Sequence, residues 1–187
     1  MRITKLDIEG FHSFRRASWI PGDLNVIIGP NGTGKSNLLR LLELISISAQ
    51  GKLGRHIQSI GGMEPIVWDG AVSSIRFVLE TSHEGTDAGP EYYELELVRL
   101  GQSSSYKIEK ELLSNSLKVK QGFESVPFKF LERFGKNGVI FDEKERKFAA
   151  PEEFVPEEES LLSIASGPFT NNHYIPPFQR GLASIAV

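Results

Sequence analysis

The feature that most constrains this chain is the octapeptide GPNGTGKS at residues 29–36, which lies between two apolar segments. It fits the pattern G-x-x-x-x-G-K-[ST], in which glycines let the backbone turn its N–H groups inward around phosphate oxygens. The apolar residues 24–28 before it predict a strand in the buried middle of a sheet. Residues 35–48 after it predict a largely buried helix, whose N-terminus favours an anion. The sequence therefore predicts a strand–loop–helix unit that binds a nucleotide phosphate.

The residues of this loop have separate expected roles. Lys35 is expected to reach the β- and γ-phosphates, and the hydroxyl of Ser36 to ligate Mg²⁺. The backbone around them supplies the phosphate cradle. The predicted binding residues are Gly29, Pro30, Asn31, Gly32, Thr33, Gly34, Lys35, Ser36 and Asn37.

The amino-acid composition excludes several other classes of function. The chain has 187 residues, 40% of them apolar, with a net charge of -3, so nucleic-acid binding would need a local basic patch. The absence of cysteine excludes disulfides and thiolate chemistry, and the four histidines lack the spacing of a metal site made of protein ligands. No apolar run is long enough for a membrane span, and the expected location is cytoplasmic.

The periodicity of the sequence predicts a β-rich domain around the loop. Strands are expected over residues 2–9 and from residue 14, followed by an antiparallel meander of 73–80, 92–100 and 105–113. Further short strands are expected within 118–150, an exposed acidic loop at 151–160, helices near 159–165 and over 177–184, and the start of a strand at 184–187. We interpret residues 1–187 as a single lobe, with a core (1–70), a β-rich insertion (71–150) and an acidic loop with a helical tail (151–187).

The stretches LDIEGFHSF and DLNVIIGPNGTGKSNLLRLLELI resemble the start of a RecF/SMC-like ABC-type ATPase head, a group that includes bacterial predicted AAA family and OLD-like ATPases. The resemblance is specific over residues 5–45 and diffuse beyond. It implies an α/β P-loop NTPase fold: an ABC-ATPase-like N-terminal lobe with a mixed sheet, a central P-loop helix and an antiparallel β-subdomain. It also implies ATP and Mg²⁺ as cofactors.

The resemblance assigns weaker roles to residues outside the loop. It implies that Phe14, Arg15 and Arg16 lie near the adenine and ribose, although a core phenylalanine and solvated arginines explain them equally well. It offers Arg55 as an arginine that approaches the phosphates, against a surface arginine as the alternative.

Hydrolysis by such ATPases needs an acidic strand end and a signature motif, and no LSGGQ-like string occurs in the sequence. Asp142 and Glu143 follow a short apolar run and could supply the magnesium ligand and the catalytic carboxylate. A hairpin turn between two short strands explains the sequence at these two positions better. Gln179 is a candidate for coupling Mg²⁺ to a partner lobe, with Gln50 and Gln58 as rivals, and each is also explained as a surface glutamine.

Three functions stay open at this point. The first is an Mg-ATP-binding lobe that needs a missing C-terminal ATPase lobe, forms a homodimer through an ATP sandwich, and serves DNA maintenance, repair or defence by family analogy, with DNA as a partner and no membrane. The second is a self-sufficient small NTPase or nucleotide kinase that uses Asp142 and Glu143. The third is a non-catalytic, nucleotide-dependent interaction module.

Overall fold

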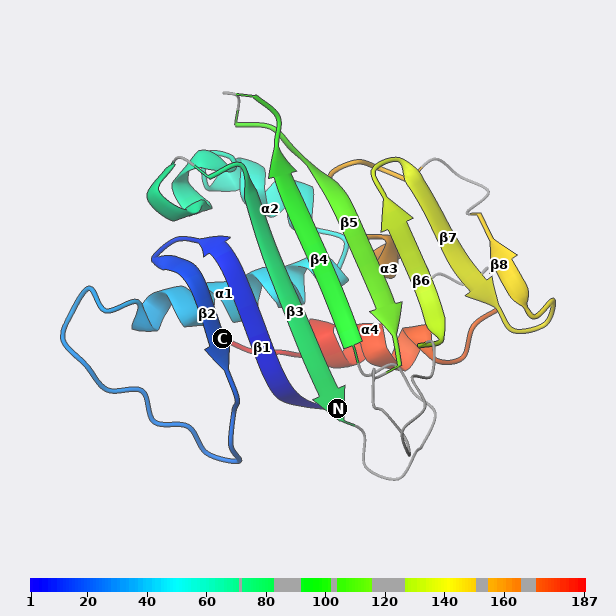
Figure 1. Ribbon diagram of the computed structural model, residues 1–187, viewed down its shortest axis with the longest axis horizontal. Coiled ribbons are helices and arrows are strands. Elements are labelled where there is room, and N and C mark those ends of the chain that lie inside the picture. Colours follow the sequence, from blue (N-terminus) through cyan, green and yellow to red (C-terminus); the bar gives the residue numbers. More distant parts are fainter. Residues whose placement is uncertain (71, 83–91, 102–103, 116–126, 151–154, 166–170) are drawn as a thin grey trace.

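The fold is a single antiparallel sheet of eight strands with helices packed on one face (Figure 1). The computed structural model describes residues 1–70, 72–82, 92–101, 104–115, 127–150, 155–165 and 171–187. Neighbouring strands follow the order β2-β1-β3-β4-β5-β6-β7-β8. The strands are β1 (Arg2–Phe11), β2 (Phe14–Trp19), β3 (Ser74–Ser82), β4 (Tyr92–Arg99), β5 (Tyr106–Ser114), β6 (Lys129–Phe134), β7 (Asn137–Asp142) and β8 (Lys147–Ala149).

The helices form a layer across the back of the sheet as it is drawn in Figure 1. Their bounds are α1 (Lys35–Ala49), α2 (Leu53–Ser59), α3 (Leu161–Ala165) and α4 (Ile175–Ala183), with two short 3₁₀ turns, η1 (Glu64–Ile66) and η2 (Trp68–Gly70). The predicted helices near 159–165 and over 177–184 are therefore confirmed. None of the helices in the described ranges is long and apolar enough to cross a membrane.

Alternating burial explains why β1 and the meander form. In β1, Leu6 and Ile8 are buried against the helices, whereas Lys5 and Asp7 point to the other face and form an ion pair. The meander β3–β4–β5 pairs antiparallel in the predicted order, and β1 lies directly between β2 and β3. The predicted core strands and the predicted β-rich insertion therefore share one sheet.

The sheet itself differs from the expected mixed sheet, because every pairing in the described ranges is antiparallel. The expected mixed sheet relied on residues 24–28 as a central strand that pairs in parallel with a neighbour. These residues do not form a strand, so no parallel pair arises there. Residues 24–28 run as an irregular, exposed stretch between β2 and the phosphate loop. Leu24, Val26 and Ile28 are each more than three-quarters exposed, so the prediction of a buried central strand is wrong.

A local turn explains how the chain leaves the sheet at this point. Gly22 donates its N–H to the side-chain oxygen of Asn25 at 2.9 Å, and the Asn25 amide returns a hydrogen bond to the Gly22 carbonyl at 3.0 Å. The chain then projects beyond the edge strand β2 before it enters α1 (Figure 1). Apolar residues become buried only where a second surface covers them, and no described element covers this segment.

Helix α1 is less buried than predicted. Leu41, Leu44, Ile45 and Ala49 in its C-terminal half are buried in the core, but Leu39 is half exposed. The phosphate-loop end of α1 therefore stands at the surface, while the other end is fixed between the sheet and α4.

Buried polar contacts hold the helical tail on the sheet. Glu111 of β5 accepts the N–H of Leu161 at 2.6 Å and that of Leu162 at 2.9 Å, which caps α3. Glu159 accepts the N–H groups of Leu53 and Gly54, both at 3.0 Å, at the start of α2. Two acidic side chains from distant parts of the chain thus cap α2 and α3, and at α3 the Ser160 hydroxyl adds a local cap by accepting the N–H of Ser163 at 3.1 Å.

Three smaller expectations need correction or stay untested. The acidic loop 151–160 is not simply exposed, because Val155 and Ser160 are buried, while 151–154 lie outside the described residues. Residues 185–187 form no strand, and the N–H of Ile185 bonds instead to the Leu182 carbonyl at 3.1 Å, at the end of α4. Of the short strands expected within 118–150, β6, β7 and β8 are present, and residues 118–126 lie outside the described ranges.

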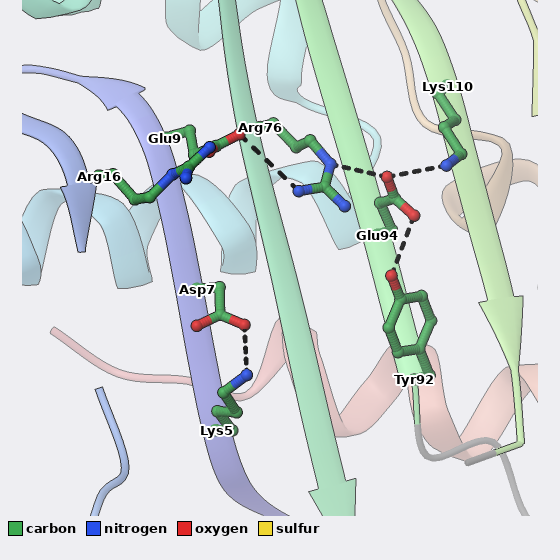
Figure 2. A network of polar contacts seen from close by, with 8 residues as sticks. All are labelled: Lys5, Asp7, Glu9, Arg16, Arg76, Tyr92, Glu94 and Lys110. Carbon is green, nitrogen blue, oxygen red and sulfur yellow. Dashed lines mark hydrogen bonds and ion pairs between the residues drawn. The ribbon is translucent and has the colours of Figure 1, made fainter. Parts of the chain in front are cut away.

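The face of the sheet opposite the helices carries a chain of ion pairs (Figure 2). Arg16 pairs with Glu9, which also contacts Arg76 at 3.8 Å. Glu94 is only 2% exposed and accepts hydrogen bonds from Arg76 at 2.8 Å, Lys110 at 3.0 Å and Tyr92 at 3.0 Å. Glu94 therefore joins strands β3, β4 and β5 on this face.

Candidate nucleotide-binding site

The phosphate loop depends on glycine at two positions. Gly32 and Gly34 have φ angles of 85° and 91°, in the left-handed region that other residues rarely adopt. A Cβ atom on Gly34 would lie 2.7 Å from the Ser13 hydroxyl oxygen and 3.6 Å from the Phe14 ring. Gly34 is thus fixed both by its backbone conformation and by the turn that packs against it.

Lys35 lies over the loop that is expected to hold the phosphates. Its ammonium donates hydrogen bonds to the carbonyls of Gly29 at 2.7 Å and Pro30 at 2.6 Å, with the Thr33 hydroxyl at 3.4 Å. Thr33 in turn donates to the Pro30 carbonyl at 3.0 Å. The positive charge is therefore already placed within the loop, and phosphate oxygens could replace neutral carbonyls as its partners.

The N-terminus of α1 completes this arrangement. The N–H groups of Asn37 and Leu38 bond to the Gly34 carbonyl at 2.9 and 3.2 Å, so the helix begins directly after the glycine. Ser36 is exposed in the first turn, where its hydroxyl is accessible to a cation. Together the loop amides, Lys35 and the helix end form an anion-binding site of the expected kind.

The turn between β1 and β2 supports the loop from behind. The Asn37 amide donates to the Ser13 hydroxyl at 2.9 Å. His12 has a left-handed φ of 46°, and its N–H bonds to the Ile66 carbonyl at 2.7 Å. Neither Ser13 nor His12 was predicted as a site residue. The motif HSF, directly before the predicted second strand, is the signal that could have indicated them.

The weaker base-side candidates have different positions. The Phe14 ring packs close to Gly34, and its expected place beside the adenine and ribose stays a prediction. The Arg15 guanidinium lies 5.5 Å from the centre of the Trp68 ring, and Arg16 pairs with Glu9 on the sheet. Arg55 is exposed on α2. Arg15 and Arg16, both in β2, thus already have partners within the chain.

The glutamine candidates lie at the wrong end of α1 for a magnesium site beside Ser36. The Gln179 amide donates to the Ala49 carbonyl at 2.5 Å, and Gln50 contacts Ser46 at 3.2 Å. Fourteen helical steps separate Ala49 from Lys35, a length of about 20 Å. Gln58 is exposed near the end of α2. None of the three is brought to the phosphate loop.

Asp142 and Glu143 belong to the β7–β8 hairpin, so the hairpin interpretation is confirmed. Asp142 accepts the N–H of Lys144 at 2.8 Å, and Glu143 accepts the N–H of His173 at 2.7 Å and contacts its ring nitrogen at 2.6 Å. Five strands lie between β7 and β2, the strand that leads to the phosphate loop. The structure therefore does not bring these carboxylates together with Ser36.

Across the described residues no group of three or more histidines and carboxylates could hold a metal ion by itself. A metal at this site would therefore take the Ser36 hydroxyl and the phosphates as its ligands. The residues present fit that arrangement, because the hydroxyl and the loop amides are on one exposed surface.

A glycine loop that runs into a helix packed on a sheet defines a P-loop nucleotide-binding domain. Residues 24–171 match the family described as "AAA domain, putative AbiEii toxin, Type IV TA system", and the chain belongs to this family. Membership of an AAA family implies nucleotide binding. The match begins at Leu24, at the start of the exposed apolar segment.

One solved structure that matches part of this chain is described as "Structural biochemistry of ATP-driven dimerization and DNA stimulated activation of SMC ATPases". The two chains share 18% identity with a TM-score of 0.40, over 58% of this chain and 68% of that chain. No curated protein matches the sequence.

Proposed function

We propose that this domain is the Mg-ATP-binding lobe of a RecF/SMC-like ATPase. The observation that carries the proposal is the placement of Lys35 over a loop whose glycines are already in the conformation of a phosphate cradle. Lys35 would contact the β- and γ-phosphates, and Ser36 would ligate the Mg²⁺ ion that bridges them. The ion would neutralise phosphate charge.

The exposed apolar segment 24–28 favours the proposal that a second lobe packs against this one. Leu24, Val26 and Ile28 are apolar, have strand-forming sequence context and are left uncovered beside the phosphate loop. Uncovered apolar side chains of this kind usually mark an interaction surface. A C-terminal ATPase lobe that adds strands next to residues 24–28 would cover them and supply acidic catalytic residues. In the complete protein, a homodimer through an ATP sandwich would supply the signature motif from the C-terminal lobe of the second copy.

Catalysis by Asp142 and Glu143 receives less support. Their carboxylates hold a hairpin and the segment before α4, at the opposite edge of the sheet. We therefore expect little or no hydrolysis by this chain alone. In the complete protein, nucleotide-driven head association would serve DNA maintenance, repair or defence. The family's description adds the toxin of a type IV toxin–antitoxin system as another setting for the same site.

The test is calorimetry with ATP and with ATPγS in the presence of Mg²⁺, beside a phosphate-release assay on the same sample. Lys35→Ala should abolish binding, and Lys52→Ala, an exposed lysine just beyond α1, is the matched control. Binding that needs Lys35 and occurs without turnover supports the proposal. Turnover by the wild type that Glu143→Gln abolishes would favour a self-sufficient enzyme instead. An absence of binding would overturn ATP binding by this lobe.

A further inference from the structure

A cavity of about 320 Å³ lies between the end of β1, the middle of α1, α2 and η1. Its apolar lining includes Phe11, Leu44 and Ile66, which are almost fully buried. Ligand sites commonly combine an apolar wall of this kind with a few polar groups. Its volume is at the lower end of the range for small-molecule pockets, which is enough for a planar ring system.

The lining also includes four polar side chains: His12, Arg40, Glu43 and His56. Arg40 donates one hydrogen bond, to the Asn37 amide oxygen at 3.2 Å. The Glu43 carboxylate and the His56 ring have no hydrogen-bond or ion-pair partner among the residues that the structure describes. The cavity therefore presents an unpaired acceptor beside a guanidinium whose remaining donors are available.

A chain of contacts connects the cavity to the phosphate loop. Arg40 bonds to Asn37, and Asn37 bonds to Ser13, whose hydroxyl packs against Gly34. Between Lys35 and the pair Arg40 and Glu43 there are five to eight helical steps, or about 8 to 12 Å along the axis. A ribose and an α-phosphate can bridge such a separation.

We propose that this cavity holds the base of the bound nucleotide, and that Glu43 selects a base with an exocyclic amine. The inference rests on the proposed function, because it assumes that the phosphates occupy the loop. A base in the cavity would stack on the apolar wall and donate its amine to the Glu43 carboxylate, while Arg40 would face the ribose or the α-phosphate. The base would thus be read by α1 and not by Arg15 or Arg16, which are held by Trp68 and Glu9.

The exposed position of Glu43 makes a direct test practical, because its substitution should not disturb the core. Calorimetry would compare Mg²⁺ complexes of ATP, of purine riboside triphosphate, which has a hydrogen atom in place of the amine, and of inorganic tripolyphosphate. The wild type should bind ATP at least about tenfold more tightly than purine riboside triphosphate, which is the effect of one hydrogen bond to a charged group. Glu43→Ala should remove this preference and leave tripolyphosphate binding unchanged.

Lys52→Ala is the control variant, and ring NMR signals of His12 and His56 provide a second readout, since a base in the cavity should shift both. The inference is overturned if Glu43→Ala keeps the preference for ATP, if it weakens tripolyphosphate equally, or if ATP binds no better than tripolyphosphate. In those cases Lys35-dependent binding would leave the proposed function intact. An absence of binding by all three compounds would overturn both.

Discussion

Asn37 in the first turn of α1 donates a hydrogen bond to the hydroxyl of Ser13, in the turn between β1 and β2, at 2.9 Å. The contact joins residues that are 24 positions apart, and it holds the sheet edge against the helix that carries the phosphate loop. A Cβ atom on Gly34 would lie only 2.7 Å from the same hydroxyl oxygen. The position of the loop thus depends on a residue outside the glycine motif.

Ser13→Ala should weaken nucleotide binding more than it weakens the fold. The variant loses one exposed hydrogen bond, which is worth about 1 kcal/mol of unfolding free energy, but it also loosens the support behind Gly34. Calorimetry with Mg-ATP and thermal denaturation measure the two effects. Ser184→Ala, which removes a hydroxyl contact at the end of α4, should leave binding unchanged. Equal binding by Ser13→Ala and the wild type would show that the turn does not position the loop.

Gly34→Ala should abolish nucleotide binding. Its φ of 91° disfavours a side chain, and the new Cβ would meet the Ser13 oxygen at 2.7 Å. Gly32→Ala is the matched comparison, because Gly32 has a similar φ of 85° but no atom within 4 Å of the new Cβ. If both variants lose binding equally, backbone strain and not the contact with Ser13 is the cause. If only Gly34→Ala loses binding, the contact with Ser13 is the cause. The double variant Ser13→Ala/Gly34→Ala should then bind nucleotide more tightly than Gly34→Ala alone.

Val26→Asp and Ile28→Asp should leave the melting temperature within about 2 °C of the wild type, because substitutions at exposed sites change stability little. Both side chains are more than three-quarters exposed. Ile45→Asp, at a fully buried position of α1, should prevent folding. A large loss of stability in the first two variants would mean that residues 24–28 are covered within this chain.

Protonation of Glu94 should make the fold less stable in acid. Burial alone would raise the pKa of Glu94, but hydrogen bonds from Arg76 and Lys110 and their charges outweigh burial and lower it. A lowered pKa in the folded state means that the ionised carboxylate stabilises the fold above its ordinary pKa of 4.5. This contribution is lost as the pH falls from that value through the lowered pKa.

Glu94→Gln should therefore cost about 2 kcal/mol of unfolding free energy at pH 7 and progressively less below pH 4.5. Urea denaturation over a pH series measures the difference between the two proteins. Exposed Glu145→Gln should show no such convergence. A difference that stays constant down to pH 3 would contradict the role given to the Glu94 charge.

Glu111→Ala should destabilise the protein by about 3 kcal/mol or more, because it leaves two buried N–H groups of α3 and the Tyr93 hydroxyl without their acceptor. Burial raises the pKa of Glu111, so a neutral substitute that keeps an acceptor is better tolerated. Glu111→Gln should accordingly cost less than Glu111→Ala in urea denaturation. The opposite order would show that the charge, and not the cap, stabilises α3.

The sequence by itself determined the elements whose stability is local. Alternation indicated β1 and the meander, because period-two burial follows directly from strand geometry. The spacing of Gly34, Lys35 and Ser36 indicated the phosphate loop, because the backbone conformation of that loop requires glycine. The hairpin at Asp142 could also be recognised, since its turn is formed by adjacent residues.

Only the tertiary structure decided what surrounds these elements. Residues 24–28 have the composition of a buried strand, but burial and pairing depend on a neighbouring surface, and the turn at Gly22 and Asn25 directs them into solvent. The support of Gly34 by Ser13, the capping of α3 by Glu111 and the placement of Glu43 beside a cavity all join residues distant in the chain. Such contacts have no periodic signal in one sequence, because their geometry is set by how the helices pack across the sheet.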